Sequence, residues 1–342
     1  MCRLTARLTG AGLPEDNNTD NPHLSNGTIS PKNMDHVGNI LELIKDPEWT
    51  RFLFQNPNGV SIGPGGDIET VLEHALAMGC DHFVLPETKL DTYKRWVRGK
   101  VHNHCRRIFG VGKYRAVTAA SNLDYSTIYK PGGVLGVTVG HLTGRVIETG
   151  ADPMGRWVYT KFNASGERNI TVIGIYQPCE QNVRTTGATT ATTQQHSLLQ
   201  QDGRHNPHRV RHHFAQDLCR FVKECKENKE LVVVGGDFNE TLGDTMDGLT
   251  KLCNDCGLVD VHNSRHGVDT HTFNTHVRGS KCIDYVLADP DLMASVQRCG
   301  YEPFRIRILG DHRGVYMDVN TRMFFGSETT PMAPPKARHL QS

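Results

Sequence analysis

The chain has 342 residues, of which 37% are hydrophobic, and its 38 Lys and Arg against 37 Asp and Glu give a formal net charge of +1. This length allows a sizeable core, and the near-neutral charge excludes nucleic-acid binding through overall charge, so such binding requires local patches. No run approaches the roughly 18 apolar residues of a membrane span, and no apolar secretory core opens the chain. We therefore expect a soluble, intracellular protein, with the nucleus as one location open to it.

The ten cysteines show no framework spacing, which in a chain of this length predicts reduced thiols in an intracellular compartment. Cys253-Asn-Asp-Cys256 is a Cys-x-x-Cys pair without a second pair elsewhere. A structural zinc site needs four ligands, so this pair predicts one face of a helix rather than a zinc centre.

Composition divides the chain into one domain and two tails. Residues 1–35 are rich in Asn, Thr, Gly, Pro and Asp and predict a disordered tail. Residues 36–325 carry the periodic hydrophobic segments of a domain, within which 179–213 is a polar insertion that we expect to be peripheral. Residues 326–342 predict a flexible C-terminal tail.

Hydrophobic periodicity predicts the elements of the domain in chain order. Helices are predicted over 37–44, 67–78, 205–229, 248–257 and 291–296. Strands are predicted over 52–54, 81–85, 114–121, 133–141, 145–148, 156–162, 170–177, 231–234, 270–273, 283–288, 304–309 and 314–319. The strands are mostly antiparallel in character and have helices between them, which favours an α/β (α+β) fold of two packed sheets covered by helices.

The segment 94–115 carries eight cationic residues and no acidic residue. They are Lys94, Arg95, Arg98, Lys100, Arg106, Arg107, Lys113 and Arg115. A charge run of this kind is ordinarily the solvated face of a helix. The complete absence of counter-charges favours a surface that faces a polyanion.

Polar side chains follow several predicted strands at the point where each strand ends. After the β-branched strand over 231–234 come two glycines, then Asp237 and Asn239, an acid that can hold a cation or orient water and an amide that can donate to a phosphate. Taken alone, such a string is also a strand followed by an Asx turn. The same placement recurs at Asn56, Glu87, Tyr176, Thr272, Asp284, Asp311 and His312. Shared placement at strand ends predicts a functional site at one end of a sandwich.

Seven blocks in this order resemble the endonuclease/exonuclease/phosphatase superfamily, which has the deoxyribonuclease-I-like fold, a four-layer sandwich. The blocks are Gln-Asn-Pro-Asn-Gly (55–59), Leu-Pro-Glu-Thr (85–88), Ile-Tyr-Gln-Pro (175–178), Gly-Asp-Phe-Asn (236–239), His-Thr-Phe (271–273), Ile-Asp-Tyr-Val (283–286) and Gly-Asp-His-Arg (310–313). The fifth and last blocks look most like those of retroelement-encoded endonucleases. Pro86 stands where the family usually has Gln and Gly310 where it has Ser, but neither change removes a ligand or the histidine.

The resemblance implies a divalent-metal-dependent phosphodiester hydrolase, in particular a DNA endonuclease of retroelement type. Its site residues carry over one by one. Glu87 would be the principal ligand of Mg²⁺ or Mn²⁺, with Asn56 and Asp311 completing the shell. Asp237 would orient or deprotonate the attacking water, while Asn239 and Tyr176 donate to the phosphate. His312, held by Asp284, would present its imidazole to the same group. Thr272, together with Arg98, Arg106 and Arg107 of the basic segment, would contact nucleic acid.

Two other functions share the same core. One is a phosphatase or phosphodiesterase acting on inositol phosphates or lipid head groups, which should expose an apolar membrane loop. The other is a catalytically silent relative that only binds nucleic acid, although the complete residue set argues against it. The resemblance also leaves open a reverse transcriptase partner and the oligomeric state.

Overall fold

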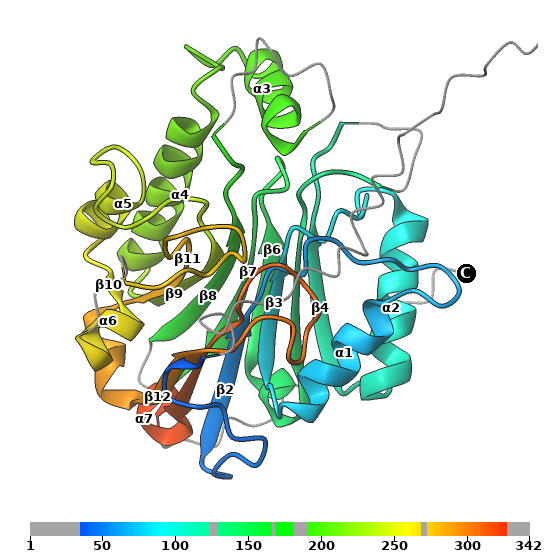
Figure 1. The fold of residues 1–342 in the computed structure, drawn as a ribbon, viewed down its shortest axis with the longest axis vertical. Coiled ribbons are helices and arrows are strands. Elements are labelled where there is room, and N and C mark those ends of the chain that lie inside the picture. The colour runs from blue at the N-terminus through cyan, green and yellow to red at the C-terminus, as the bar shows by residue number, and fades with distance from the viewer. Residues whose placement is uncertain (1–34, 124–128, 166–167, 181–189, 268–271, 327–342) are drawn as a thin grey trace, which may run out of the picture.

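The computed structural model describes residues 35–123, 129–165, 168–180, 190–267 and 272–326. The predicted N-terminal tail up to residue 34, the predicted C-terminal tail from residue 327 and residues 181–189 of the predicted insertion lie outside these ranges. The described chain forms two β-sheets packed face to face, with helices on the outer faces of both (Figure 1). This four-layer arrangement confirms the predicted sandwich.

The first sheet has seven strands in the order β1-β12-β13-β2-β3-β5-β4. They are β1 (Val37–Gly38), β12 (Val296–Tyr301), β13 (Val315–Asn320), β2 (Trp49–Phe54), β3 (His82–Pro86), β5 (Val134–Val139) and β4 (Tyr114–Ala119). The second has six strands in the order β10-β11-β9-β8-β7-β6. They are β10 (Val259–Asp260), β11 (Asp284–Ala288), β9 (Leu231–Asp237), β8 (Asn169–Tyr176), β7 (Trp157–Asn163) and β6 (Val146–Ala151). The pairs β2–β3 and β8–β9 are parallel and the other pairs antiparallel.

Helices α1 (Ile68–Ala77) and α2 (Arg95–Phe109) cover the outer face of the seven-stranded sheet. In α2, Val97, Val101 and Cys105 recur at every fourth position and are buried, which turns the basic residues outward as predicted. Helices α4 (Val210–Glu227) and α5 (Leu249–Cys256) lie on the side of the six-stranded sheet. The remaining helices are α3 (Ala191–Gln201), α6 (Val261–His266) and α7 (Thr321–Phe325), with short 3-10 helices at Gly140–Arg145 and Pro290–Ser295. Within the described residues, no helix combines the length and apolar character needed to cross a membrane.

Glycines in β8 and β9 bring the two sheets into close contact. A Cβ atom on Gly174 would lie 2.2 Å from Cγ1 of Val84, and one on Gly235 would lie 2.6 Å from Cδ1 of Phe54. Val84 and Phe54 belong to β3 and β2 of the opposite sheet and are fully buried in the shared core. Because these two positions carry no side chain, β8 and β9 can lie close to β3 and β2 of the opposite sheet. Polar residues follow the ends of these strands.

Three predicted elements are wrong. The predicted helix over 37–44 is instead the short strand β1 followed by irregular chain, because Gly38 has a φ of 80° and Val37 pairs with Tyr301. The predicted strand over 304–309 consists of turns and bends in which Arg305 has a φ of 58°. The chain forms the strand β12 just before this segment, and the sequence did not indicate that strand. For the predicted strand over 270–273, the described residues 272 and 273 form a bend.

The polar insertion is less peripheral than its composition predicts. Its residues 191–201 form α3, which begins with a capping box made by Thr190 and Thr193. One face of α3 is buried, including Leu198 and Leu199. Thr and Gln side chains on the same face conceal this amphipathic pattern in the sequence. The predicted helix over 205–229 is confirmed from Val210 onward as α4.

We expect the Gly174→Val variant to lose stability by at least about 1–3 kcal/mol, because its side chain would overlap Val84 and force the sheets apart. Gly99→Ala is the matched control. A Cβ on Gly99, in the middle of α2, meets no atom within 4 Å, so this variant should gain about 0.5–1 kcal/mol from helix propensity. Denaturant unfolding of both variants checks the prediction, and equal stabilities would contradict it.

Candidate active site

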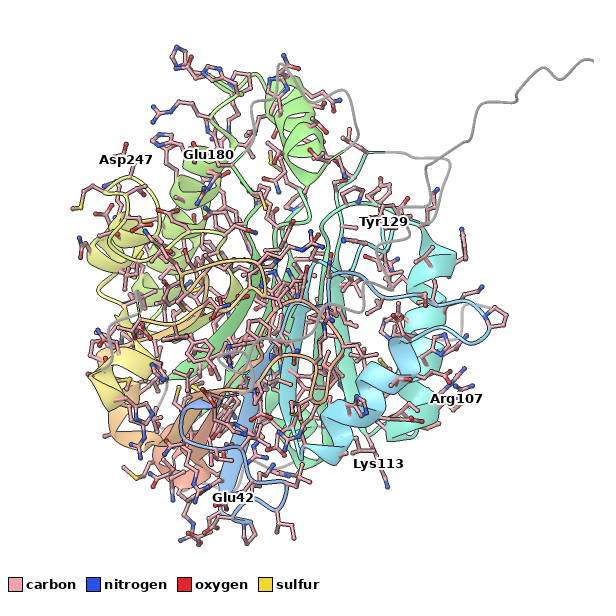
Figure 2. All side chains as sticks on the ribbon, viewed as in Figure 1. Glu42, Arg107, Lys113, Tyr129, Glu180 and Asp247 are labelled. Carbon is pink, nitrogen blue, oxygen red and sulfur yellow. The ribbon has the colours of Figure 1, made fainter. Side chains whose placement is uncertain are left out.

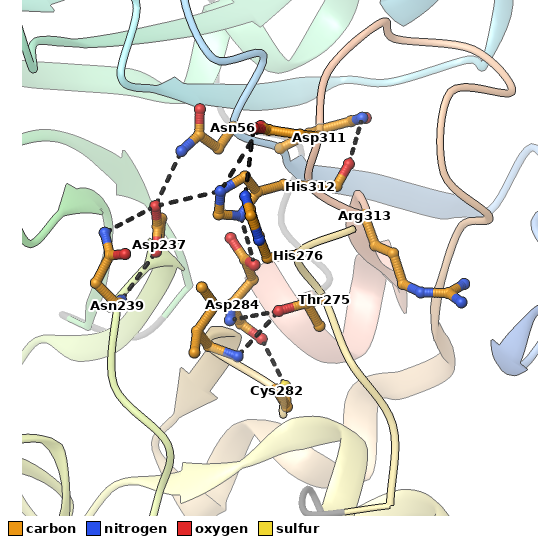
Figure 3. A network of polar contacts seen from close by, with 12 residues as sticks. Asn56, Asp237, Asn239, Thr275, His276, Cys282, Asp284, Asp311, His312 and Arg313 are labelled. Carbon is orange, nitrogen blue, oxygen red and sulfur yellow. Dashed lines mark hydrogen bonds and ion pairs between the residues drawn. The ribbon is translucent and has the colours of Figure 1, made fainter. Parts of the chain in front are cut away.

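Polar side chains from both sheets meet where β2, β3 and β9 end (Figure 3). Asn56 follows β2, Glu87 follows β3, and Asp237 is the last residue of β9. Asp284 begins β11 and lies opposite Asp237 in the antiparallel register between these strands. His312 lies in the loop that leads into β13. The structure thus brings these five predicted residues to one end of the sandwich, and the predicted residues Asn239 and Asp311 join them there.

Asn56 links the two sheets through its side-chain amide. Its Nδ2 donates to Oε2 of Glu87 and to Oδ2 of Asp237, both at 2.9 Å. Its Oδ1 accepts a 2.7 Å hydrogen bond from the backbone N–H of Asn58. Asn56 is fully buried, so the satisfied amide fixes the separation of the two carboxylates.

His312 and Asp284 form a buried pair. The Nδ1 atom of the imidazole lies 2.9 Å from Oδ2 of Asp284, and Nε2 faces Oδ2 of Asp237 at 3.9 Å. Burial alone would lower the pKa of His312, but the carboxylates of Asp284 and Asp237 outweigh it and raise the pKa to about 10. The imidazole is therefore a cation at neutral pH. On the other side, Oγ1 of Thr275 accepts a 3.2 Å hydrogen bond from the backbone N–H of Asp284 and holds the start of β11.

Asp237 is fully buried, and burial is the main cause that raises its pKa to about 8. The His312 cation opposes this shift, whereas the Asp284 and Glu87 carboxylates add to it. The backbone N–H of Asn239 donates to Oδ1 of Asp237 at 2.8 Å, and its Nδ2 donates to Oδ2 at 3.0 Å. A carboxylate that titrates near neutral pH and is held in this way suits proton transfer.

Glu87 and Asp311 offer oxygen ligands beside this pair. Oδ2 of Asp311 accepts from Nδ2 of Asn58 at 2.9 Å and lies 3.3 Å from Nε2 of His276, while its Oδ1 is buried without a hydrogen-bond partner. Glu87 is paired with Lys89, whose Nζ lies 3.3 Å from Oε1. An orphaned carboxylate oxygen and a hard oxygen donor set fit a divalent cation such as Mg²⁺.

The backbone at the site is strained. Asn58, Glu87, Lys89 and Asn239 all have positive φ values, between 47° and 57°, although none of them is glycine. Such conformations cost on the order of 1–3 kcal/mol each and persist only where the surroundings impose them. Four of them around one network indicate that this backbone is shaped by the site rather than by stability.

The remaining predicted site residues are Tyr176, Thr272 and three arginines of α2. Tyr176 lies beside Asp237, its register partner in the neighbouring strand β9. Tyr176 ends β8, is buried, and has a pKa raised well above its usual range by burial first and then by nearby carboxylates, so its hydroxyl keeps its proton. Thr272 is exposed in a bend. Arg98, Arg106 and Arg107 are exposed on α2, and Arg107 also pairs with Glu69 of α1.

Four residues of the network were not predicted from the sequence. Asn58 lies inside the block 55–59 and Lys89 directly follows the block 85–88, so their closeness in sequence to Asn56 and Glu87 was a signal that could have been used. Thr275 and His276 had no such signal. His276 reaches the site because it forms an isolated β-bridge with His312, and their rings meet edge to face at 4.9 Å between centroids.

We predict that Asp284→Asn lowers the pKa of His312, because the carboxylate that most favours the charged imidazole is removed. NMR titration of the His312 ring measures this shift directly. The pair stabilises the fold fully below the ordinary histidine pKa of about 6.5, and this contribution is lost as pH rises through about 10. The variant should therefore be less stable by about 1–3 kcal/mol near pH 7, with a smaller gap above pH 10. Asp291→Asn, at an exposed surface pair, is the control. An unmoved His312 titration would show that the two groups do not act together.

Comparisons with known proteins identify the family and the fold of this chain. A model of the Endonuclease/Exonuclease/phosphatase family matches residues 73–312, more than half of the chain. No curated protein matches the chain in sequence. Among solved structures, the AP endonuclease LMAP from Leishmania major is similar with a TM-score of 0.56 at 14% identity, covering 86% of this chain and 96% of that one.

Two further structures have the same fold. The 3'-5' exonuclease NExo from Neisseria meningitidis has a TM-score of 0.53 at 17% identity, covering 79% of this chain and 100% of that one. The catalytic domain of human Nocturnin has a TM-score of 0.52 at 12% identity, covering 83% of this chain and 96% of that one. At these identities the likeness shows the fold alone. The family match and the deoxyribonuclease-I-like architecture together show that the chain belongs to the Endonuclease/Exonuclease/phosphatase family.

Proposed function

We propose that this protein is a divalent-metal-dependent phosphodiester hydrolase that acts on nucleic acid. Its substrate is DNA, and it works as an endonuclease of retroelement type. The observation that carries the proposal is the network in which Asn56 joins Glu87 to Asp237 while His312 is held by Asp284. In this proposal Asp237 is the base, His312 the cation, and Glu87 with Asn56 part of the ligand set. Enzymes of this superfamily hydrolyse phosphodiester bonds and generally depend on a divalent metal.

Glu87, Asn56 and Asp311 are the residues that would hold the metal. The orphaned Oδ1 of Asp311 and the partly exposed carboxylate of Glu87 supply hard oxygen ligands, and Asn56 keeps Glu87 in place. Bound there, Mg²⁺ or Mn²⁺ would neutralise charge on the phosphoryl oxygens.

The remaining groups of the network would transfer the proton and stabilise the negative charge of the phosphate. Asp237, when ionised, would accept a proton from the attacking water; its raised pKa makes it a stronger base than an ordinary carboxylate, and Asn239 keeps it oriented. His312 remains protonated at neutral pH and presents Nε2 as a donor to the negative phosphate, where charge develops in the transition state. Tyr176 keeps its hydroxyl proton and adds a second donor. Both donors come from rigid, buried elements, so little reorganisation accompanies the reaction.

The choice of nucleic acid rests on charge and on structural neighbours. The exposed face of α2 carries cations without an acidic residue, which suits a phosphate backbone. Among the similar structures, one is an AP endonuclease and another is a 3' phosphatase from Neisseria bound to a product DNA hairpin. The closing Asp-His-Arg-Gly block supports the retroelement type, in which a reverse transcriptase would be the functional partner.

We expect Glu87→Gln to abolish hydrolysis, with a loss of at least about 10²-fold, because an amide is a weak ligand for a hard cation. The measurement is incubation with supercoiled plasmid, an abasic duplex, RNA and inositol phosphates, with and without Mg²⁺. Glu73→Gln, on the exposed face of α1, is the matched control and should retain full activity. Full Mg²⁺-dependent turnover by Glu87→Gln would remove this residue from the metal site, and turnover of inositol phosphates alone would replace nucleic acid as the substrate.

A second prediction concerns the arginines of α2. Reversing Arg98, Arg106 and Arg107 to Glu should weaken DNA binding and flatten its dependence on salt, because fewer counterions are released from the DNA. The slope of log Kd against log salt concentration measures the effect, with reversal of Lys229 and Arg322 as a charge control away from α2. An unchanged slope would mean that this face of α2 is only solvated.

A further inference from the structure

Three aromatic side chains are exposed on two segments that meet near Glu87, Tyr93 and Trp96 on the chain after Glu87 and Tyr129 on the segment bridged to Leu90. Tyr93, Trp96 and Tyr129 are 58%, 51% and 56% exposed. Within the ranges that the structure describes, they are the exposed members of the Phe, Tyr and Trp residues, since the others are buried or half-buried. Large exposed aromatic surface is costly to leave in water, so its concentration at one place indicates a binding surface.

Backbone hydrogen bonds join the two segments that carry these side chains. The backbone N–H of Lys130 donates to the carbonyl of Lys89 at 2.8 Å, and Leu90 forms a β-bridge with Tyr129. Lys89 in turn contacts Glu87 through its ammonium group. Through these backbone contacts, the segments that carry the aromatic side chains border the proposed hydrolytic site at Glu87. Figure 2 shows Tyr129 near the upper end of the helix α2.

A buried ion pair between Lys130 and Asp91 links the two segments that carry the aromatic side chains. Lys130 is 1% exposed, and its Nζ lies 2.7 Å from Oδ1 of the fully buried Asp91 and 5.8 Å from the centroid of the Tyr93 ring. Lys94 pairs with the other oxygen of Asp91 at 3.4 Å. Flat side chains on a fixed backbone lose little conformational entropy when a ligand stacks on them.

Cations surround the aromatic rings. Lys94, Arg95 and Arg98 lie at the start of α2, whose first turn contains no acidic residue. Nζ of Lys100 lies 5.3 Å from the centroid of the Trp96 ring, and about half of the Trp96 side chain (51%) is exposed. Aromatic rings interleaved with cations are the combination that binds single-stranded nucleic acid, because every base has a π-face and every linkage a negative charge.

We propose that Tyr93, Trp96 and Tyr129 form a stacking platform for unpaired bases next to the cleaved phosphodiester. The proposal rests on the proposed nuclease function and extends it to a substrate class, nucleic acid with a single-stranded or unwound segment at the site. A lipid surface would also accept aromatic residues and cations. The three side chains, however, carry no exposed Leu, Ile or Val beside them on 87–100, so insertion into acyl chains is not favoured.

The test measures binding of a short oligothymidylate, and of a blunt duplex of equal length, in the inactive Glu87→Gln background without metal. Trp96→Ala and Tyr129→Ala should each weaken binding of the single strand about 5- to 100-fold and binding of the duplex much less. Trp96→Phe should restore affinity, since it keeps the ring. Ile147→Ala is the control at an equally exposed apolar position. Lys100→Gln should weaken both ligands similarly through charge.

Tryptophan fluorescence gives a second readout, because Trp96 is exposed whereas Trp49 is half-buried and Trp157 buried. Stacking of a base on Trp96 should quench the emission of the Glu87→Gln protein, and the quench should disappear in Trp96→Phe although binding persists. Unchanged single-strand affinity in both alanine variants would overturn the platform. If the alanine variants lose binding to anionic phosphatidylserine vesicles but still bind oligothymidylate, the surface binds a membrane instead. If the platform binds single strands but the wild-type protein with Mg²⁺ cleaves none of them, the proposed function fails while the platform stands.

Discussion

The contact between the two sheets at Gly174 and Gly235 is the constraint on which the site depends. Stacked sheets ordinarily lie about 10 Å apart, with side chains filling the space between them. Here two glycines let Val84 and Phe54 press against the opposite backbone. Because Glu87 and Asn56 follow those same strands, the spacing that packs the core also decides whether one amide can span two carboxylates from different sheets. Core packing and site geometry are therefore one property of this fold.

The site brings several carboxylates close to the imidazolium of His312. Asp237, Asp284 and Asp311 gather near His312, and one imidazolium cannot neutralise all three. Glu87 has a separate partner in Lys89. Burying like charges in this way opposes folding, which the fold tolerates because the surrounding hydrogen bonds are nearly complete. The excess negative charge is what a divalent cation would relieve. Burial, with the neighbouring carboxylates, raises the pKa of Asp237, so ligand binding and proton transfer depend partly on the same set of charges.

The sequence predicted the elements whose own residues determine them. β8 and β9 are runs of β-branched residues, so local patterns were sufficient to predict them. The helix α2 was not among the predicted helices, although Val97, Val101 and Cys105 form a helical stripe. β12 was missed because Val-Gln-Arg-Cys-Gly-Tyr has no alternation, and pairing with β1 and β13 makes it a strand. Asn56, Glu87 and Asp237 were predicted as neighbours through family resemblance, whereas His276 depends on a bridge between distant segments. The unusual Gly310 has a local reason, since a Cβ there would lie 2.9 Å from the carbonyl oxygen of Asn56.

The left-handed backbone at Asn58, Glu87, Lys89 and Asn239 has a consequence for attempts to make the protein more robust. Replacement by glycine relaxes such a backbone, so screens for thermal tolerance would be drawn to these four positions. Each such replacement also deletes a side chain that touches Glu87, Asp237 or Asp311, or is Glu87 itself. Heat resistance gained at these positions would therefore come with an inactive site. Substitutions that keep both stability and activity have to lie elsewhere, for example in the solvent-facing turns of the helices.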